Sequence, residues 1–222
     1  MNNPNYESSD RRPINSRNTR WAQRIAHGLA TKNVTANSIS VLGMLAAVFA
    51  GVAFAMTSQT IGLPQRILWL FGGLLCQVRL LCNLFDGMVA IEQDQASPKG
   101  ELYNEVPDRV SDAAIFIGLG YATTGSPIIG LLAALLAVFV AYVRAMVKST
   151  GAPNDFCGPM AKPHRMALVT LLSAYFTFAP AQWHTGFGDV KMMLWVVVAG
   201  CGVTAIRRLN RAVRFLENKV SQ

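Results

Sequence analysis

Six long apolar stretches, separated by short polar breaks, dominate the pattern of this chain. Each stretch is long enough to cross a bilayer, because roughly 20 helical residues at about 1.5 Å each span a hydrocarbon core of about 30 Å. We therefore predict an all-α integral membrane protein with six transmembrane helices. The predicted spans are 36–57, 66–91, 101–123, 127–148, 165–181 and 190–209.

The composition agrees with this pattern. Of the 222 residues, 52% are hydrophobic and 14% are charged, and the mean hydropathy is +0.31. An ordinary soluble domain is less apolar and carries more charge. The sequence contains no internal repeat, so residues 36–222 are predicted to form one membrane domain, preceded by a basic segment over residues 1–35.

Apolar residues in the basic segment before the first span recur at helical spacing. Trp21, Ile25 and Leu29 recur at four-residue steps, so on a helix they would share one apolar face. Neighbouring arginines can reach lipid headgroups, and one interpretation is an interfacial helix over residues 18–29. The other interpretation is a disordered basic tail.

Lysine and arginine are concentrated in alternate connections of the six-span plan. The connections near 58–65, 124–126 and 182–189 are nearly free of them, whereas the other connections and both chain ends are basic. Because cytoplasmic loops carry this excess, both termini are expected on the cytoplasmic side of a bacterial inner membrane. The net charge of +8 then reflects contact with membrane lipids, and the sequence shows no module typical of nucleic-acid binding.

Polar residues interrupt the second and third spans at their expected cytoplasmic ends. Asn83 and Asp86 are three residues apart and share a helix face with Ala90, while Gly87 keeps that face thin. After a short break, acidic and amide residues recur every three or four positions along the third span. These residues are Glu101, Asn104, Glu105, Asp108 and Asp112.

Two antiparallel helices joined by a short loop would bring these two polar stripes together. Carboxylates near a membrane are costly without a partner, and a cluster of oxygen ligands without histidine or cysteine suits a hard cation. We therefore expect Mg²⁺ or Mn²⁺ at this place. The alternative is that these residues cap helices or face water.

The run from Asn83 to Asp108 resembles the signature of the CDP-alcohol phosphatidyltransferases, D-x2-D-G-x2-A-R-x8-G-x3-D-x3-D. The spacing of that signature is intact here. Its positions are Asn83, Asp86-Gly87, Ala90-Ile91, eight residues, Gly100, Asn104 and Asp108.

This resemblance implies six transmembrane helices, a homodimer, and a cytoplasm-facing cavity that holds a CDP-linked lipid and two divalent metals. Family members transfer a phosphate-linked group from a CDP-alcohol to a second alcohol and release CMP. By position, Asp86 would ligate metal and Asp108 would be the general base. The residues expected to line the nucleotide are Gly87, Ala90 and Gly100.

A further nucleotide-binding candidate, Asn37, lies at the start of the first span. The segment Thr35-Ala36-Asn37 resembles a Thr-Pro-Asn-like motif of the family but lacks the proline. The alternative is that Thr35, Asn37 or Ser38 caps a helix that begins there.

Three positions depart from the family pattern. Asn83 and Asn104 stand where the family has its first and third aspartates, and Ile91 replaces the usual arginine. An asparagine offers a carbonyl oxygen to a metal but no negative charge. The ion is therefore expected on Asp86 and Asp108, with Asn83 and Asn104, and with compensating carboxylates from the same stripe. The compensating candidates are Glu101, Glu105 and Asp112.

Basic residues are expected at the same level as this site. Arg79 lies one turn before Asn83 and would pair with the carboxylates, either within the site or as a purely structural ion pair. Arg144, Lys162 and Arg165 surround the fourth connection, similar to the basic region where family members hold the phosphate of an acceptor. Anchoring of cytoplasmic loops is the alternative role for basic residues here.

The function favoured by these observations is transfer of a phosphatidyl group from CDP-diacylglycerol, or a similar CDP-alcohol, to an alcohol acceptor in phospholipid synthesis. The alternative is a catalytically weakened relative that binds nucleotide or lipid without turnover. A small transporter would explain buried polar residues but not the spacing of the signature. The acceptor alcohol is left open.

Overall fold

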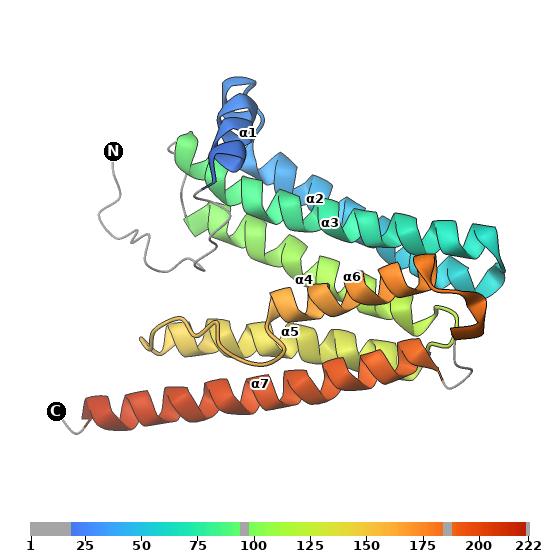
Figure 1. Ribbon diagram of the computed structural model, residues 1–222. Helices are drawn as coiled ribbons and strands as arrows, with labels where there is room; N and C mark the ends of the chain where they lie inside the picture. The colour runs from blue at the N-terminus through green and yellow to red at the C-terminus, as the bar shows by residue number, and fades with distance from the viewer. Residues whose placement is uncertain (1–18, 94–97, 184–187, 221–222) are drawn as a thin grey trace.

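The computed structural model describes residues 19–93, 98–183 and 188–220, apart from the side chains of residues 98–102, 181 and 220. These residues form seven α-helices and two short 3-10 turns (Figure 1). Six helices overlap the six predicted spans in order, and one short helix precedes them. The helices are α1 (Arg20–Thr31), α2 (Ala36–Met56), α3 (Leu63–Glu92), α4 (Pro98–Gly120), α5 (Pro127–Ser149), α6 (Lys162–Phe178) and α7 (Asp189–Val220).

Four helices, α2, α3, α5 and α7, are long and apolar enough to cross a membrane. The protein is therefore an integral membrane protein, as predicted. Within the part of the chain that the structure describes, α4 and α6 do not reach the same combination of length and hydropathy. The reasons differ, because α6 has 17 residues and α4 carries the polar stripe.

Local sequence signals set where several helices begin. The Thr35 side chain accepts a hydrogen bond from the Ser38 backbone N–H at 3.2 Å, so Thr35 is the N-cap of α2. Proline lies in the first turn of α3, α5 and α6, where its missing N–H costs nothing. Helix α4 continues through Pro107, whose missing N–H removes one backbone hydrogen bond. The Ser111 hydroxyl donates to the carbonyl oxygen of Pro107 at 2.6 Å.

Helix α2 lies between α3 and α4 and packs extensively against both. The contact with α4 depends on Gly51 and Gly118, because a Cβ on Gly118 would lie 2.1 Å from the Gly51 carbonyl oxygen. Two backbones approach this closely only where side chains are absent. As a result, α3 and α4 touch each other at few points although they are consecutive.

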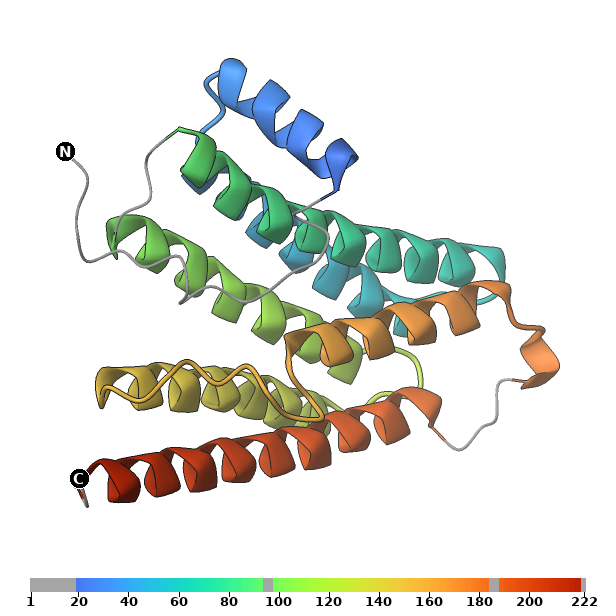
Figure 2. The ribbon, with the colours of Figure 1, turned by 60° about the vertical axis from the view of Figure 1, so that its left-hand side comes forward.

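The remaining helices complete the bundle. Helix α5 packs against α4 and α7, and α6 lies between α3 and α7 (Figure 2). At the heart of the apolar core, the Trp69 ring is fully buried, with its centroid 4.5 Å from that of Phe176 and 5.3 Å from that of Phe54. This aromatic cluster joins α2, α3 and α6.

The segment Arg20–Thr31, for which the sequence left two interpretations, is a helix. It packs against α3 through Ala22 and Ala26, which are buried, and through an edge-to-face contact between Trp21 and Phe85 at 6.1 Å. Trp21 and Ile25 are exposed, which suits an interfacial position. Residues 1–18 of the predicted basic segment lie outside the described residues.

The connection between α5 and α6 is tied to the bundle through α7. The Arg208 guanidinium donates to the carbonyl oxygens of Cys157 and Val140, each at 3.0 Å. The Thr204 hydroxyl accepts from the Met160 N–H at 3.0 Å. These contacts place the start of α6, and with it Lys162, beside the polar stripe of α4.

Candidate active site

Asp86 is buried between two helices. It lies on α3, has 3% of its surface exposed, and accepts a hydrogen bond at Oδ2 from the Ser40 hydroxyl of α2 at 2.8 Å. Its Oδ1 accepts from the backbone N–H of Gly87 at 2.6 Å. Ser40 was not anticipated from the sequence, where the signal was a single hydroxyl inside an apolar span.

Asp108 joins three helices. Its Oδ1 contacts the Arg79 Nη2 of α3 and the Lys162 Nζ of α6, the latter at 2.6 Å. The other carboxylate oxygen, Oδ2, has a longer 3.5 Å contact with Arg109 Nη2. The two oxygens of Asp108 therefore differ in their partners. Oδ1 contacts two basic side chains closely, whereas Oδ2 has one longer contact.

Arg79 is 1% exposed and has a second anchor on α4. Its Nε donates to the Ser111 hydroxyl at 2.9 Å. The sequence did not indicate that Ser111 belongs to the site. A Cβ on Gly43 of α2 would lie 2.9 Å from Arg79 Nη1, so a glycine at this position makes room for the guanidinium. The predicted pairing of Arg79 with the carboxylates is thus present.

The other basic candidates also contact carboxylates. Arg165 pairs with Asp112 at 2.6 Å inside the bundle, where their side chains are 2% and 1% exposed, and Arg165 Nη1 donates to the Met160 carbonyl at 3.0 Å. Arg144 pairs with Glu105 and lies over the Phe156 ring, 5.4 Å from its centroid. Glu105 also contacts Arg109 at 3.3 Å. Each described acidic side chain of the α4 stripe therefore has a basic partner.

Lys162 begins α6 and points into the same cluster. Its ammonium group is largely enclosed, and burial lowers the pKa of Lys162 well below the ordinary value, while the carboxylate of Asp112 opposes that shift. The contact with Asp108 supplies the negative charge that a buried ammonium requires.

The two asparagines that replace family aspartates have unpaired oxygens. Among the described residues, neither Asn83 Oδ1 nor Asn104 Oδ1 has a hydrogen-bond partner, although both atoms are buried. The Arg79–Asp108 pair sets the register of α3 against α4. Asn83 lies one turn beyond Arg79 and Asn104 one turn before Asp108, so the antiparallel helices place the two amides at the same level.

The side-chain oxygens at the level of the signature determine whether the site can bind a divalent cation. No group of three or more His, Cys, Asp or Glu side chains in the described ranges is placed to hold a metal. The two unpaired amide oxygens of Asn83 and Asn104, at the level of the signature, do offer hard ligands, and such buried oxygens otherwise cost free energy. The arrangement thus suits one hard cation at Asn83, Asp86 and Asn104 better than a cation on Asp108.

The candidate nucleotide contacts lie on the helix ends around this level. Gly87 and Ala90 are half-buried on α3, and Asn37 is exposed in the first turn of α2. Gly100 and Glu101 fall within α4, but their side-chain surroundings lie outside what the structure describes.

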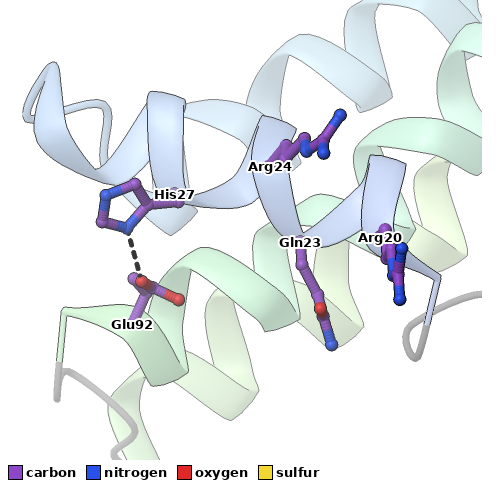
Figure 3. Close-up of a pocket in the computed structure, with 5 residues that line it drawn as sticks. All are labelled: Arg20, Gln23, Arg24, His27 and Glu92. Carbon is purple, nitrogen blue, oxygen red and sulfur yellow. Dashed lines mark hydrogen bonds and ion pairs between the residues drawn. The ribbon is translucent and has the colours of Figure 1, made fainter.

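A shallow pocket lies between α1 and the end of α3, and Figure 3 shows its lining residues. The His27 Nδ1 and a carboxylate oxygen of Glu92 are 2.8 Å apart across this junction. Both groups are partly exposed, so the pair is a surface contact. The lining residues are Arg20, Gln23, Arg24, His27 and Glu92.

Comparison with known proteins identifies the class to which this fold and site belong. The family model of the CDP-alcohol phosphatidyltransferases matches residues 33–207, which include the whole signature and five complete helices. The chain therefore belongs to the CDP-alcohol phosphatidyltransferase family.

Individual relatives come from bacteria and archaea. The inner membrane protein YnbA of Escherichia coli is 21% identical, over 76% of this chain and 83% of that protein. The phosphatidylinositol phosphate synthase of Mycolicibacterium smegmatis is 25% identical, over 74% of each chain. The archaetidylinositol phosphate synthase of Pyrococcus horikoshii is 22% identical, over 88% of this chain and 92% of that protein.

Solved structures of a mycobacterial relative share the fold. A crystal structure of Mycobacterium tuberculosis phosphatidylinositol phosphate synthase with CDP-DAG bound has a TM-score of 0.72 and 21% sequence identity, over 87% of this chain and 94% of that one. A structure of the same synthase in complex with manganese and citrate has a TM-score of 0.70, with the same identity, over 86% and 88%.

Proposed function

We propose that this protein is a membrane-embedded phosphatidyltransferase of phospholipid biosynthesis. It transfers a phosphatidyl group from CDP-diacylglycerol, or a similar CDP-alcohol, to an alcohol acceptor and releases CMP. The observation that carries the proposal is that Asp86 of α3 and Asp108 of α4 are both buried at the positions of the family signature, with Arg79 of α3 paired to Asp108. The CDP-DAG complex of a mycobacterial relative supports this class of donor.

Asp108 is the proposed general base. Its Oδ1 is bound by Arg79 and Lys162, so Oδ2 is the oxygen available to accept a proton. The acceptor hydroxyl oxygen attacks the phosphorus that carries the diacylglycerol, the bond from that phosphorus to the CMP oxygen breaks, and the hydroxyl proton passes to Asp108 Oδ2. CMP leaves with the electron pair of the broken bond.

A divalent cation is the proposed cofactor, and a relative solved with manganese supports it. Asn83, Asp86 and Asn104 offer the oxygens not taken by basic side chains, and Glu101 lies one turn before Asn104. When bound, Mg²⁺ or Mn²⁺ supplies positive charge that neutralises the diphosphate and the departing phosphate. Gly87, Ala90, Gly100 and Asn37 are proposed to line the nucleotide, because small side chains let a bulky ligand approach a helix.

The proposed acceptor contacts are Arg144, Lys162 and Arg165. Arg144, paired with Glu105, and Lys162, paired with Asp108, retain some exposed surface, whereas Arg165 is enclosed with Asp112. We assign phosphate contact chiefly to the first two. Arg144 can exchange Glu105, whose side chain is 41% exposed, for a phosphate. Lys162 has three N–H donors, so it can bind a phosphate while it stays at Asp108. A phosphorylated acceptor such as glycerol 3-phosphate or inositol phosphate fits this arrangement.

The proposed orientation places the site, both chain ends and the basic turns of α1 and α7 on the cytoplasmic side. The last turns of α7 lie at the same end of the bundle as the end of α3 (Figure 1). Arg207, Arg211 and Arg214 are exposed there, in keeping with the excess of positive charge in cytoplasmic segments. A homodimer, as the family resemblance implies, is part of the proposal, and crosslinking in membranes would test it.

The deciding experiment measures CMP release by purified protein from labelled CDP-diacylglycerol with a panel of acceptors. We expect turnover that stops with EDTA and returns with Mg²⁺ or Mn²⁺. Asp108→Asn should abolish product, whereas Asp155→Asn, in the loop beside Arg211, should retain it. A folded protein that binds CDP-diacylglycerol but releases no CMP with any acceptor would instead be a weakened relative without turnover.

A further inference from the structure

Arg79 and Lys162 occupy the place where a cation on Asp108 would lie. Both basic groups contact the same oxygen, Asp108 Oδ1. A metal ion coordinated by that oxygen would have to displace them, and Arg79 is 1% exposed with a second hydrogen bond to Ser111. Expelling a guanidinium from this position leaves it without a partner in an apolar interior, which is costly.

The surrounding helices are shaped around the guanidinium. Gly43 of α2 leaves the space into which Arg79 Nη1 extends, since a Cβ there would be 2.9 Å away. The Arg79 side chain is therefore buried between α2 and α4, whereas an exposed arginine side chain can move into solvent.

The net charge of the signature positions also disfavours a second cation. Asn83 and Asn104 replace two carboxylates, so four positions that would carry four negative charges carry two. Two divalent ions would bring four positive charges to these positions, in addition to Arg79 and Lys162. Without bound substrate, this positive charge exceeds that of the two signature carboxylates, and unbalanced charge is costly in a low-dielectric site.

A single cation, by contrast, finds suitable ligands away from Asp108. The buried Oδ1 atoms of Asn83 and Asn104 have no hydrogen-bond partner in the described part of the chain, and Asp86, one turn beyond Asn83 on α3, contributes a carboxylate whose oxygens accept from a hydroxyl and a backbone N–H. Carbonyl and carboxylate oxygens are the ligands that Mg²⁺ and Mn²⁺ prefer.

We propose that this protein binds one divalent cation, through Asn83, Asp86 and Asn104, and that Arg79 and Lys162 take the place of a second one at Asp108. The inference rests on the proposed function for the role of that cation. It concerns the number of ions, so it can fail while the transferase activity stands.

The test is a Mn²⁺ titration of the purified full-length protein in detergent, with electron paramagnetic resonance to count bound ions and detect coupling. We expect one ion per chain with an uncoupled spectrum. Arg79→Met/Lys162→Met, which frees Asp108, should bind two ions about 4 Å apart with a spin-coupled spectrum. Arg66→Met is the matched control, because Arg66 lies in the first half of α3 and donates to the Ala179 carbonyl at 2.9 Å, and it should bind one ion.

Two coupled ions in the wild-type protein would overturn the inference, as would no bound ion, or one ion in a folded double variant. The wild-type count decides the question by itself if the double variant does not fold. CMP release is measured in parallel. If the wild-type protein binds two ions and releases CMP, the one-cation inference fails and the proposed activity stands. If it binds one ion and releases no CMP, the proposed activity fails and the one-cation inference stands.

Discussion

Arg79 of α3 and Asp108 of α4 form an ion pair inside the helix bundle, with 1% and 11% of their side chains exposed. Lys162 of α6 binds the same carboxylate oxygen at 2.6 Å. This relationship links three helices at the level of the family signature, and it distinguishes Asp108 from Asp86, whose oxygens accept from a hydroxyl and a backbone N–H. Asp108 therefore has two close basic partners on Oδ1 and one contact at 3.5 Å on Oδ2, the oxygen that we propose accepts the proton.

Asp112→Asn is expected to destabilise the fold because it leaves Arg165 as a buried charge without its partner. Breaking one side of such a pair costs about 3 to 5 kcal/mol. Asp112→Leu/Arg165→Met removes both charges and should lose less stability than the single variant. Thermal unfolding in detergent, followed by circular dichroism, measures the difference. An Asp112→Asn protein as stable as wild type would show that the pair contributes nothing.

Gly43→Ala is expected to disturb the site from a neighbouring helix. Its Cβ would lie 2.7 Å from Cys82 Cβ and 2.9 Å from Arg79 Nη1, so α2 or Arg79 must shift, at a cost of about 1 to 3 kcal/mol. We expect a lower rate of CMP release at saturating donor. Gly202→Ala on α7 is the control, since no atom lies within 4 Å of its added Cβ. Equal rates in the two variants would contradict the role of Gly43.

Cys157 is expected to be the thiol that a membrane-impermeant maleimide labels. It is exposed in the connection between α5 and α6, whereas Cys76, Cys82 and Cys201 are buried. If that connection faces the cytoplasm, labelling should occur in inverted membrane vesicles and not in intact cells. Cys157→Ser should remove it. Labelling from outside intact cells would reverse the proposed orientation.

The attachment of α1 should depend on apolar packing more than on its ion pair. Ala26 is 1% exposed, so Ala26→Leu is expected to detach the helix and speed hydrogen exchange of its amides. His27→Ala removes the partly exposed contact with Glu92, and such pairs contribute up to about 1 kcal/mol. It should therefore change exchange little. The reverse order of effects would mean that His27 and Glu92 hold α1 in place.

The positions of the helices could be predicted from the sequence because long apolar runs leave few alternatives to a helix in a membrane. The six predicted segments appear as α2 to α7, and α7 continues to Val220, beyond the predicted end of the last span. The signature also located Asp86 and Asp108 within the correct pair of helices. These features depend on local spacing, which a sequence shows directly.

The partners within the site could not be predicted in the same way. Ser40 and Ser111 bind Asp86 and Arg79, yet a single serine in a helix has no distinctive spacing. The sequence also did not indicate that the ammonium of Lys162 contacts Asp108. Such pairings depend on how α6 lies against α3 and α4, which no local pattern specifies.

By itself, the sequence determined that this is a helical membrane protein of the CDP-alcohol phosphatidyltransferase family, with Asn83 and Asn104 in two aspartate positions. Only the tertiary structure decided which charges meet. Helix α2 inserts between α3 and α4 where Gly51 and Gly118 permit contact, and that packing sets which buried groups come within hydrogen-bond distance. Because a buried charge must find a partner nearby, the packing assigns Arg79 and Lys162 to Asp108.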